Sequence, residues 1–218
     1  GEGAPLVPAG DKFLFSEYEV CLNLGGIANL SLDHGRQRIA FDICFCNMAL
    51  NLLAAEASKK YDKNGMMAAD GTIDTKLLKA LSKQYTRYRS RRPSLGREIF
   101  ESDLESLLAD KSISLNDRLC TFTESAALEI CNAIRAYKKS ARVLCTGGGA
   151  FNAYLITRML EHGGDNLTFI IPDDDVVKFK EALVFAFLGV LRVRNEVNCL
   201  KSVTHALRDS SSGTVVGL

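Results

Sequence analysis

The chain has 218 residues, of which 47% are hydrophobic and 24% are charged, and its formal net charge is +1. This composition is typical of a soluble globular protein that buries a sizeable core in one or two domains. The near-neutral charge and the longest apolar run, residues 182–191, lead us to expect neither nucleic acid nor a membrane as a partner.

Seven cysteines stand in a chain that opens without a secretory signal or an initiator methionine. Most of them lie in apolar runs, which predicts reduced thiols in the core of a cytoplasmic protein. Cys44 and Cys46 lack the usual spacing of a zinc site, and no second pair completes one. The opening residues 1–8 read as the interior of a longer protein.

The first part of the chain predicts an antiparallel meander. Three segments rich in strand-forming residues are separated by turn residues, namely 19–24, 27–32 and 37–41. Gly25-Gly26 forms the first turn, and Asp42 closes the third strand. Apolar residues at helical spacing then predict a helix over residues 47–60.

The middle of the chain predicts helices, of which the last is long: residues 75–82, residues 102–108 and a helix that Asn116 caps. Residues 66–71 read as a loop. Residues 85–98 read as an irregular, basic and aromatic segment, because Pro93 and Gly96 interrupt it. Such a patch can bind nucleic acid, but a solvated loop is the expectation in a nearly neutral chain.

The last third alternates strands and helices, which predicts an α/β domain. A buried strand over residues 141–145 leads through three glycines into a helix over residues 150–162. A strand over residues 167–171 and a helix over residues 175–193 follow. That last helix is apolar nearly all round, which predicts that it is buried.

Three consecutive glycines, Gly147, Gly148 and Gly149, mark the junction of strand and helix. Glycines in a row weaken a fold unless the backbone needs positive φ or something must approach it closely. At a helix N-terminus that ligand is often a phosphate. No Gly-Lys-Ser/Thr is present, and a dinucleotide fingerprint needs glycine or alanine where Asn152 stands. A turn required only for packing is the alternative.

The Gly25-Gly26 hairpin can also offer backbone N–H groups to phosphate oxygens, although Gly-Gly is common in hairpins. Its neighbours are short or apolar: Ile27, Ala28 and Asn29. The order is more informative: a glycine hairpin, a strand ending in Asp42, helices, a strand with three glycines and an apolar helix. This order resembles the second half of the actin-like ATPase (ribonuclease H-like) fold, an α/β domain whose mixed sheet contains antiparallel hairpins and is flanked by helices.

Within that superfamily, the chain is similar to the anhydro-N-acetylmuramic acid kinase family. The similar segments extend from end to end, and their combination is specific: residues 1–8, residues 22–30, Phe41-Asp42 with Asn47, residues 94–98, residues 146–152, and Glu181-Ala182 with Phe185-Ala186. The resemblance implies a cytoplasmic enzyme of peptidoglycan recycling. With ATP and Mg²⁺ it opens the 1,6-anhydro ring of its amino-sugar substrate with water and phosphorylates O6, giving N-acetylmuramic acid 6-phosphate.

The resemblance also implies roles for single residues. The second phosphate loop is matched by Gly25, Gly26, Ile27, Ala28 and Asn29, and the adenosine loop by Gly147, Gly148, Gly149 and the following Asn152. Glu181 matches a glutamate at the sugar site, and Asp42 matches the aspartate near the metal and phosphates. The alternatives are an N-cap role for Asp42 and an ion pair with Lys178 for Glu181.

Departures from the family pattern bear on activity. The first phosphate loop and the water-activating aspartate lie upstream in the family, so we expect no catalytic residue here and no turnover by this chain alone. Residues 1–18 would connect from an N-terminal domain, and residues 19–218 would form the C-terminal domain. Phe45 replaces part of a Gly-Pro-Gly type turn and is expected to narrow the cleft. His205 replaces a glycine where positive φ would favour one.

A non-catalytic nucleotide-binding or interaction module of the same fold is the alternative function, and another sugar or acetate kinase of the superfamily is the third. Besides ATP and Mg²⁺, the expected partners are an amino sugar and the N-terminal domain of the same protein. Relatives are expected to pair, which leaves a homodimer open for this chain.

Overall fold

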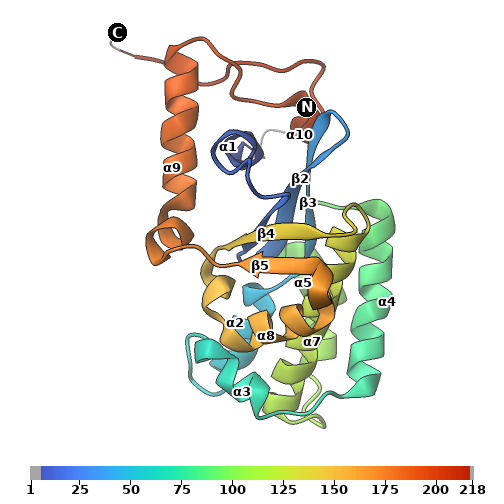
Figure 1. Ribbon diagram of the computed structural model, residues 1–218. Helices are drawn as coiled ribbons and strands as arrows, with labels where there is room; N and C mark the ends of the chain where they lie inside the picture. The colour runs from blue at the N-terminus through green and yellow to red at the C-terminus, as the bar shows by residue number, and fades with distance from the viewer. Residues whose placement is uncertain (1–5, 217–218) are drawn as a thin grey trace.

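The computed structural model describes residues 6–216 and is built on a five-stranded mixed sheet in the order β3-β2-β1-β4-β5 (Figure 1). The strands are β1 (Val20–Leu24), β2 (Ile27–His34), β3 (Gln37–Phe45), β4 (Ala141–Thr146) and β5 (Leu167–Ile170). The pairs β1–β2 and β2–β3 are antiparallel, whereas β1–β4 and β4–β5 are parallel. This arrangement confirms the predicted meander and the α/β alternation that follows it.

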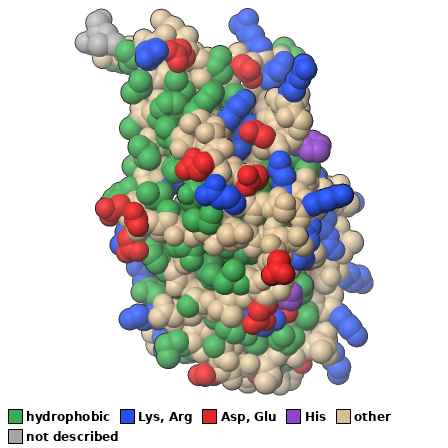
Figure 2. Space-filling view, in the orientation of Figure 1, with side chains coloured by type: hydrophobic (Ala, Val, Ile, Leu, Met, Phe, Trp, Pro, Cys, Tyr) green, Lys and Arg blue, Asp and Glu red, His purple; other side chains and the backbone are tan. Residues whose placement is uncertain are grey.

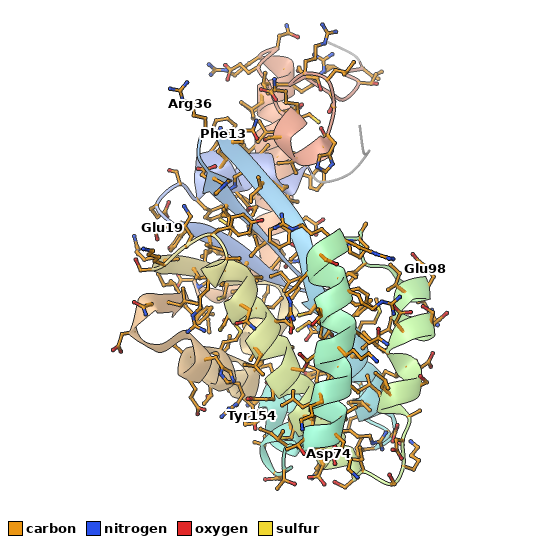
Figure 3. All side chains as sticks on the ribbon, turned by 90° about the vertical axis from the view of Figure 1, so that its right-hand side faces the viewer. Phe13, Glu19, Arg36, Asp74, Glu98 and Tyr154 are labelled. Carbon is orange, nitrogen blue, oxygen red and sulfur yellow. The ribbon has the colours of Figure 1, made fainter. Side chains whose placement is uncertain are left out.

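One face of the sheet packs against most of the helices. They are α2 (Asn47–Ala55), α3 (Met66–Ala69), α4 (Thr75–Arg91), α5 (Arg97–Asp103), α6 (Glu105–Leu108), α7 (Leu115–Arg135) and α8 (Ala153–Gly163). Figure 3 shows α4 and α5 standing side by side, with Asp74 at the lower end of α4. The main core lies between these helices and inward-facing strand residues such as Val20, Leu22 and Leu24.

The opposite face of the sheet carries α1 (Val7–Leu14), α9 (Asp174–Val193) and the short α10 (Lys201–Thr204). Because side chains alternate along a strand, Cys21 points to this face and joins a second core with Val184 and Leu188 of α9. Helices α1 and α9 touch closely, since a Cβ added to Gly10 would lie 2.5 Å from Val184.

A buried polar network joins α1, α9 and the sheet. Lys180 Nζ lies 2.7 Å from Asp11 Oδ1, and both side chains are more than nine-tenths buried. The Ser31 hydroxyl donates to Asp11 Oδ2 at 2.5 Å, and Arg38 Nη2 donates to Ser31 Oγ at 2.9 Å. Buried charges are tolerated only when they are paired in this way, so the network fixes how α9 sits on the sheet.

Several predicted boundaries were wrong. Strand β3 continues beyond Asp42 to Phe45, and the helix predicted over residues 47–60 ends at Ala55. Residues 66–71 contain α3 rather than a loop. Ser114, not Asn116, caps α7, because its Oγ accepts the N–H of Asp117 at 3.1 Å.

The segment expected to be irregular begins as helix, since α4 continues to Arg91. The buried residues Leu77, Leu81, Tyr85 and Tyr88 recur at intervals of three and four, which is the spacing of one helix face. The tyrosines are therefore core residues, and the chain leaves the helix only at Arg92, with φ of +45°.

The prediction that α9 is buried all round was also wrong. Its buried positions form one face, made by Val177, Lys180, Val184, Leu188 and Leu191. Large apolar side chains on its other sides, such as Phe179 and Leu183, are about half exposed or more. Within residues 6–216, every helix is too short or too polar to cross a bilayer.

Lys180→Met is expected to lower the free energy of unfolding by about 3 kcal/mol, because it leaves the Asp11 carboxylate buried without a counter-ion. Lys178→Met is the matched control on the same helix. Its ion pair with Asp174 is solvent-exposed, so the loss should stay below about 0.5 kcal/mol. Urea denaturation of both variants measures the difference, and equal losses would contradict a structural role for the buried pair.

Candidate functional site

A cavity of about 1220 Å³ opens on the face of the sheet that carries α1 and α9. Residues of β1, β2 and β3 line it together with α9, the turn at Gly147, the segment after α4 and His205. Typical small-molecule pockets measure roughly 300–1,000 Å³. The cavity therefore has room for a ligand as large as a nucleotide with a small molecule beside it.

A row of polar side chains crosses four strands along this cavity. Asp42 pairs with Asn29, Asn29 with Asn23, and Asn23 with Thr146 in the strand registers. All four residues line the cavity. Sequence reasoning singled out Asp42 and Asn29 and missed the other two. The available signal was Asn23 between Leu22 and Leu24, where a polar residue faces away from the main core.

The triple-glycine turn rests on the end of β1. Gly147 has φ of +82°, and a Cβ there would lie 2.5 Å from Asn23 Oδ1 and 2.9 Å from the Leu24 carbonyl oxygen. A Cβ on Gly149 would lie 2.8 Å from Leu24 Cβ. Packing therefore suffices to explain these two glycines. Gly148 differs, because a Cβ there would meet nothing closer than Asn47 Nδ2 at 3.7 Å.

The Gly25-Gly26 turn adjoins the triple-glycine turn through Leu24. Its carbonyl oxygens accept N–H groups at the start of α2, including that of Asn47 at 3.1 Å. Asn47 Nδ2 in turn donates to the Leu24 carbonyl oxygen at 3.0 Å. The two glycine turns are thus neighbours, joined by the end of β1 and the first residue of α2.

The predicted site residues divide into two groups. Five line the cavity: Asn29, Asp42, Gly147, Gly148 and Glu181. Six do not: Gly25, Gly26, Ile27, Ala28, Gly149 and Asn152. Of these, Ala28 is fully buried in the main core and Ile27 packs against that core. Asn152 caps α8, since its Oδ1 accepts the N–H of Leu155 at 3.1 Å.

Asp42 lies at the edge of the cavity with a half-buried carboxylate. Its Oδ2 accepts the N–H of Leu95 at 2.9 Å, which ties the segment after α4 to β3. Burial raises the pKa of Asp42, and the hydrogen bond from Leu95 opposes that rise. The N-cap alternative was wrong, because Cys46 occupies the N-cap of α2. A carboxylate penalised by burial gains from a nearby cation.

Glu181 lines the cavity from α9, which lies on the face of the sheet opposite the main core. The expected alternative, an ion pair with Lys178, was wrong, because Lys178 Nζ pairs with Asp174 at 2.8 Å. Among residues 6–216, no hydrogen bond or ion pair engages the Glu181 carboxylate. It is exposed and available to a polar ligand.

The structure shows where the two residues that depart from the family pattern, Phe45 and His205, lie. Phe45 is fully buried and packs edge-on against Phe100, with ring centroids 5.2 Å apart, so the expectation that it narrows the cleft was wrong. His205 lines the cavity with φ of +53°. The position does therefore adopt the left-handed conformation in which glycine is favoured.

Arginines that we expected in a solvated loop also line the cavity. Arg91 is the last residue of α4 and Arg92 follows it there, and the Arg92 guanidinium lies 4.5 Å from the centre of the Phe41 ring. They bring positive charge to the wall next to Asp42. Within residues 6–216, no three His, Cys, Asp or Glu side chains gather as a metal site.

Comparison with known proteins identifies the family of the chain. The model of the anhydro-N-acetylmuramic acid kinase family matches residues 1–217. Proteins of that name from Sulfurimonas denitrificans and Vibrio parahaemolyticus are each 32% identical to the chain. The alignments cover 99% of this chain and 62% and 60% of those proteins, respectively. The chain thus spans about three fifths of the length of these curated relatives.

A solved structure supports the fold. The activator of the 2-hydroxyisocaproyl-CoA dehydratase from Clostridium difficile, solved with bound ADPNP, superposes with a TM-score of 0.53 at 14% identity. The match covers 87% of this chain and 67% of that one. This confirms the predicted actin-like ATPase fold, and by sequence the chain belongs to the anhydro-N-acetylmuramic acid kinase family.

Proposed function

We propose that this chain is the C-terminal, nucleotide-binding part of an ATP-dependent kinase that opens the 1,6-anhydro ring of anhydro-N-acetylmuramic acid with water and phosphorylates O6. The observation that carries the proposal is the convergence on one cavity of the glycine turn, the polar row and Glu181. Family membership supports the sugar-kinase chemistry, and the product would be N-acetylmuramic acid 6-phosphate, formed in the cytoplasm during peptidoglycan recycling.

The nucleotide would lie along the turn at Gly147 and Gly148. Gly148 is the glycine that packing does not require, and a missing side chain there lets a phosphate approach the backbone closely. The neighbouring Gly25-Gly26 hairpin, through Asn29, would form the second side of the phosphate site. ADPNP bound to the related activator supports ATP as the nucleotide.

Mg²⁺ fits the donors near Asp42. The ion takes oxygen ligands, usually from one or two carboxylates, substrate phosphates and water. Asp42 has one carboxylate oxygen engaged by Leu95, and burial already favours a cation beside it. Bound there with the nucleotide, the ion would neutralise phosphate charge. Asp42 would hold it, directly or through water, while Asn29 and Asn23 keep the adjacent row polar.

The amino sugar would lie between α9 and the segment after α4. Glu181 offers an unengaged carboxylate to sugar hydroxyl or amide groups. Arg91 and Arg92 supply positive charge for an anionic group of the substrate or for the nucleotide phosphates. Positioning and charge neutralisation are the main requirements of phosphoryl transfer, and these residues provide both.

ATP with Mg²⁺ is expected to stabilise the chain against heat. At one hundred times the dissociation constant, the ligand adds about 2.7 kcal/mol, which corresponds to a rise in Tm of roughly 5–10 °C for a chain of this size. Asp42→Asn should remove the increment that Mg²⁺ adds to the ATP shift, and Asp165→Asn, on the exposed turn before β5, should keep it. A full Mg²⁺ increment in Asp42→Asn would refute the metal role.

The variants Gly148→Ala and Gly147→Ala distinguish a glycine that ligand binding requires from a glycine that packing requires. Gly148→Ala is expected to change the free energy of unfolding by less than about 1 kcal/mol and to weaken ATP binding about tenfold, because its methyl group enters the phosphate space. Gly147→Ala should cost more than about 2 kcal/mol, since positive φ and the Leu24 carbonyl oppose a Cβ. Urea denaturation and calorimetric titration measure both, and unchanged ATP affinity in Gly148→Ala would contradict the nucleotide placement.

The 218-residue protein by itself is expected not to phosphorylate the anhydro sugar, because the resemblance to the family implies that the aspartate which activates the water precedes the matched segment. Incubation with ATP, Mg²⁺ and the anhydro sugar, followed by mass spectrometry of the sugar, tests this. Any enzyme-dependent 6-phosphate would show that a group within this chain activates the water.

A further inference from the structure

Charge is unevenly distributed along the chain, although the formal net charge is only +1. Residues 75–92 contain seven lysines and arginines and no aspartate or glutamate, so the rest of the chain holds 20 basic and 26 acidic residues. This segment is α4 together with its C-cap residue. Such an asymmetry is typical of proteins that bind a polyanion, and a near-neutral total does not reveal it.

Five of these basic residues share one side of α4, which we call the basic face: Lys76, Lys79, Lys83, Arg87 and Arg91. At about 100° per residue they fall within an arc of roughly 120°, and all five are exposed. The buried leucines and tyrosines of α4 lie on the opposite side. Figure 2 shows Lys and Arg side chains along the lower right edge of the molecule, where α4 lies in Figure 1.

The basic face lacks acidic partners. In the described part of the chain, residues 6–216, none of its five side chains forms an ion pair, and Arg87 donates to the neighbouring Gln84. By contrast, Arg89 lies outside this face and pairs with Glu129 at 2.5 Å. Four of the five basic residues follow one another at intervals of four, and like charges at that spacing destabilise a helix. Helix α4 therefore keeps a row of repelling charges that folding alone does not require.

We propose that the basic face binds the phosphate backbone of a double-stranded nucleic acid without reading its sequence. This inference does not depend on the proposed function, because Arg91 is the only one of the five residues that lines the cavity. From Lys76 to Arg91 the face spans about 22 Å of helix axis, with a positive charge roughly every 6 Å. A duplex carries one phosphate per about 1.7 Å of its axis, so several of these side chains can reach phosphates at once.

The residues around these charges favour a duplex over a membrane or a single strand. A helix that binds a membrane surface inserts an apolar face beside its basic residues, but the apolar side of α4 is buried in the main core. Tyr85 and Tyr88 are buried as well, so neither can stack on the bases of a single strand. Ala80 and Ser90 share the basic face and add no large apolar side chain. Contacts to phosphates remain, and these carry no sequence information.

Fluorescence anisotropy with labelled DNA and RNA duplexes of random sequence tests the proposal. At about 100 mM KCl the chain is expected to bind both duplexes with a Kd of about 100 µM or tighter. Lys79→Glu/Lys83→Glu should weaken binding about tenfold or more, because two phosphate contacts become repulsive. The variant should keep the Tm of the wild-type chain, since both lysines are exposed and the change relieves repulsion between like charges.

Lys59→Glu/Lys60→Glu is the matched control, because it makes the same change in net charge at exposed lysines outside α4. It should weaken duplex binding less than about threefold, through the overall field alone. Equal losses in the two double variants would overturn the proposal, and so would a wild-type Kd weaker than about 1 mM for both duplexes. A single strand that binds more tightly than either duplex would also overturn it.

The dependence of binding on salt tests the contact to phosphates. Each neutralised phosphate of duplex DNA contributes about −0.9 to the slope of log K against log salt, so four or five contacts predict a slope of about −4. Lys83→Ala and Arg87→Ala should each make the slope shallower by about 1, whereas Lys59→Ala should leave it unchanged. A wild-type slope shallower than about −2 would contradict a row of phosphate contacts.

Vesicles of phosphatidylcholine with about 30% phosphatidylglycerol test the membrane alternative, because their surface attracts basic residues without offering a duplex. The wild-type chain is expected to bind these vesicles more weakly than either duplex. Vesicle binding that Lys79→Glu/Lys83→Glu abolishes, together with duplex binding that this variant leaves unchanged, would assign the basic face to a membrane and overturn the proposal.

Discussion

The parallel pairing of β1 with β4 is the constraint on which the site depends. Parallel neighbours end at the same edge of a sheet, and ligands of α/β proteins bind beyond those carboxyl ends. Here the pairing places Asn23 beside Thr146, so the chain that turns at Gly25 and the chain that turns at Gly147 leave the sheet side by side. The two glycine turns are more than a hundred residues apart in the sequence, and the pairing of the strands alone makes them neighbours.

Helices α1 and α9 complete the site, and a buried ion pair between them holds them in place in addition to apolar packing. Lys180 stands on the buried face of α9, and its pairing with Asp11 fixes the rotation of the helix. Glu181 is the next residue and lies about 100° further around the helix, which turns it to the cavity. The buried lysine thus determines where the exposed carboxylate points.

The sequence was sufficient to predict the features that depend on residues close together in the chain. The glycine turns, the meander and the alternating strands and helices each depend on neighbouring residues. Features that depend on register were missed, because Asn23 and Thr146 acquire a role only when β1 lies beside both β2 and β4. Helix ends also depended on tertiary structure. For example, α2 ends at Ala55, and Ser58 then turns into positive φ, although Ala57 still fits the apolar spacing of the predicted helix.

The wrong prediction for α9 has a physical cause. An apolar surface all round a helix indicates burial, but it does not state which molecule buries each side. The structure assigns one side to the sheet and α1 and one to the cavity, and it leaves a third side exposed. Leaving that much apolar area in water is unfavourable by about 25 cal/mol per Å². Apolar periodicity therefore predicts that a helix has apolar sides, whereas the packing of the other elements decides which of those sides is covered, and here it leaves Phe179, Leu183 and Val190 exposed.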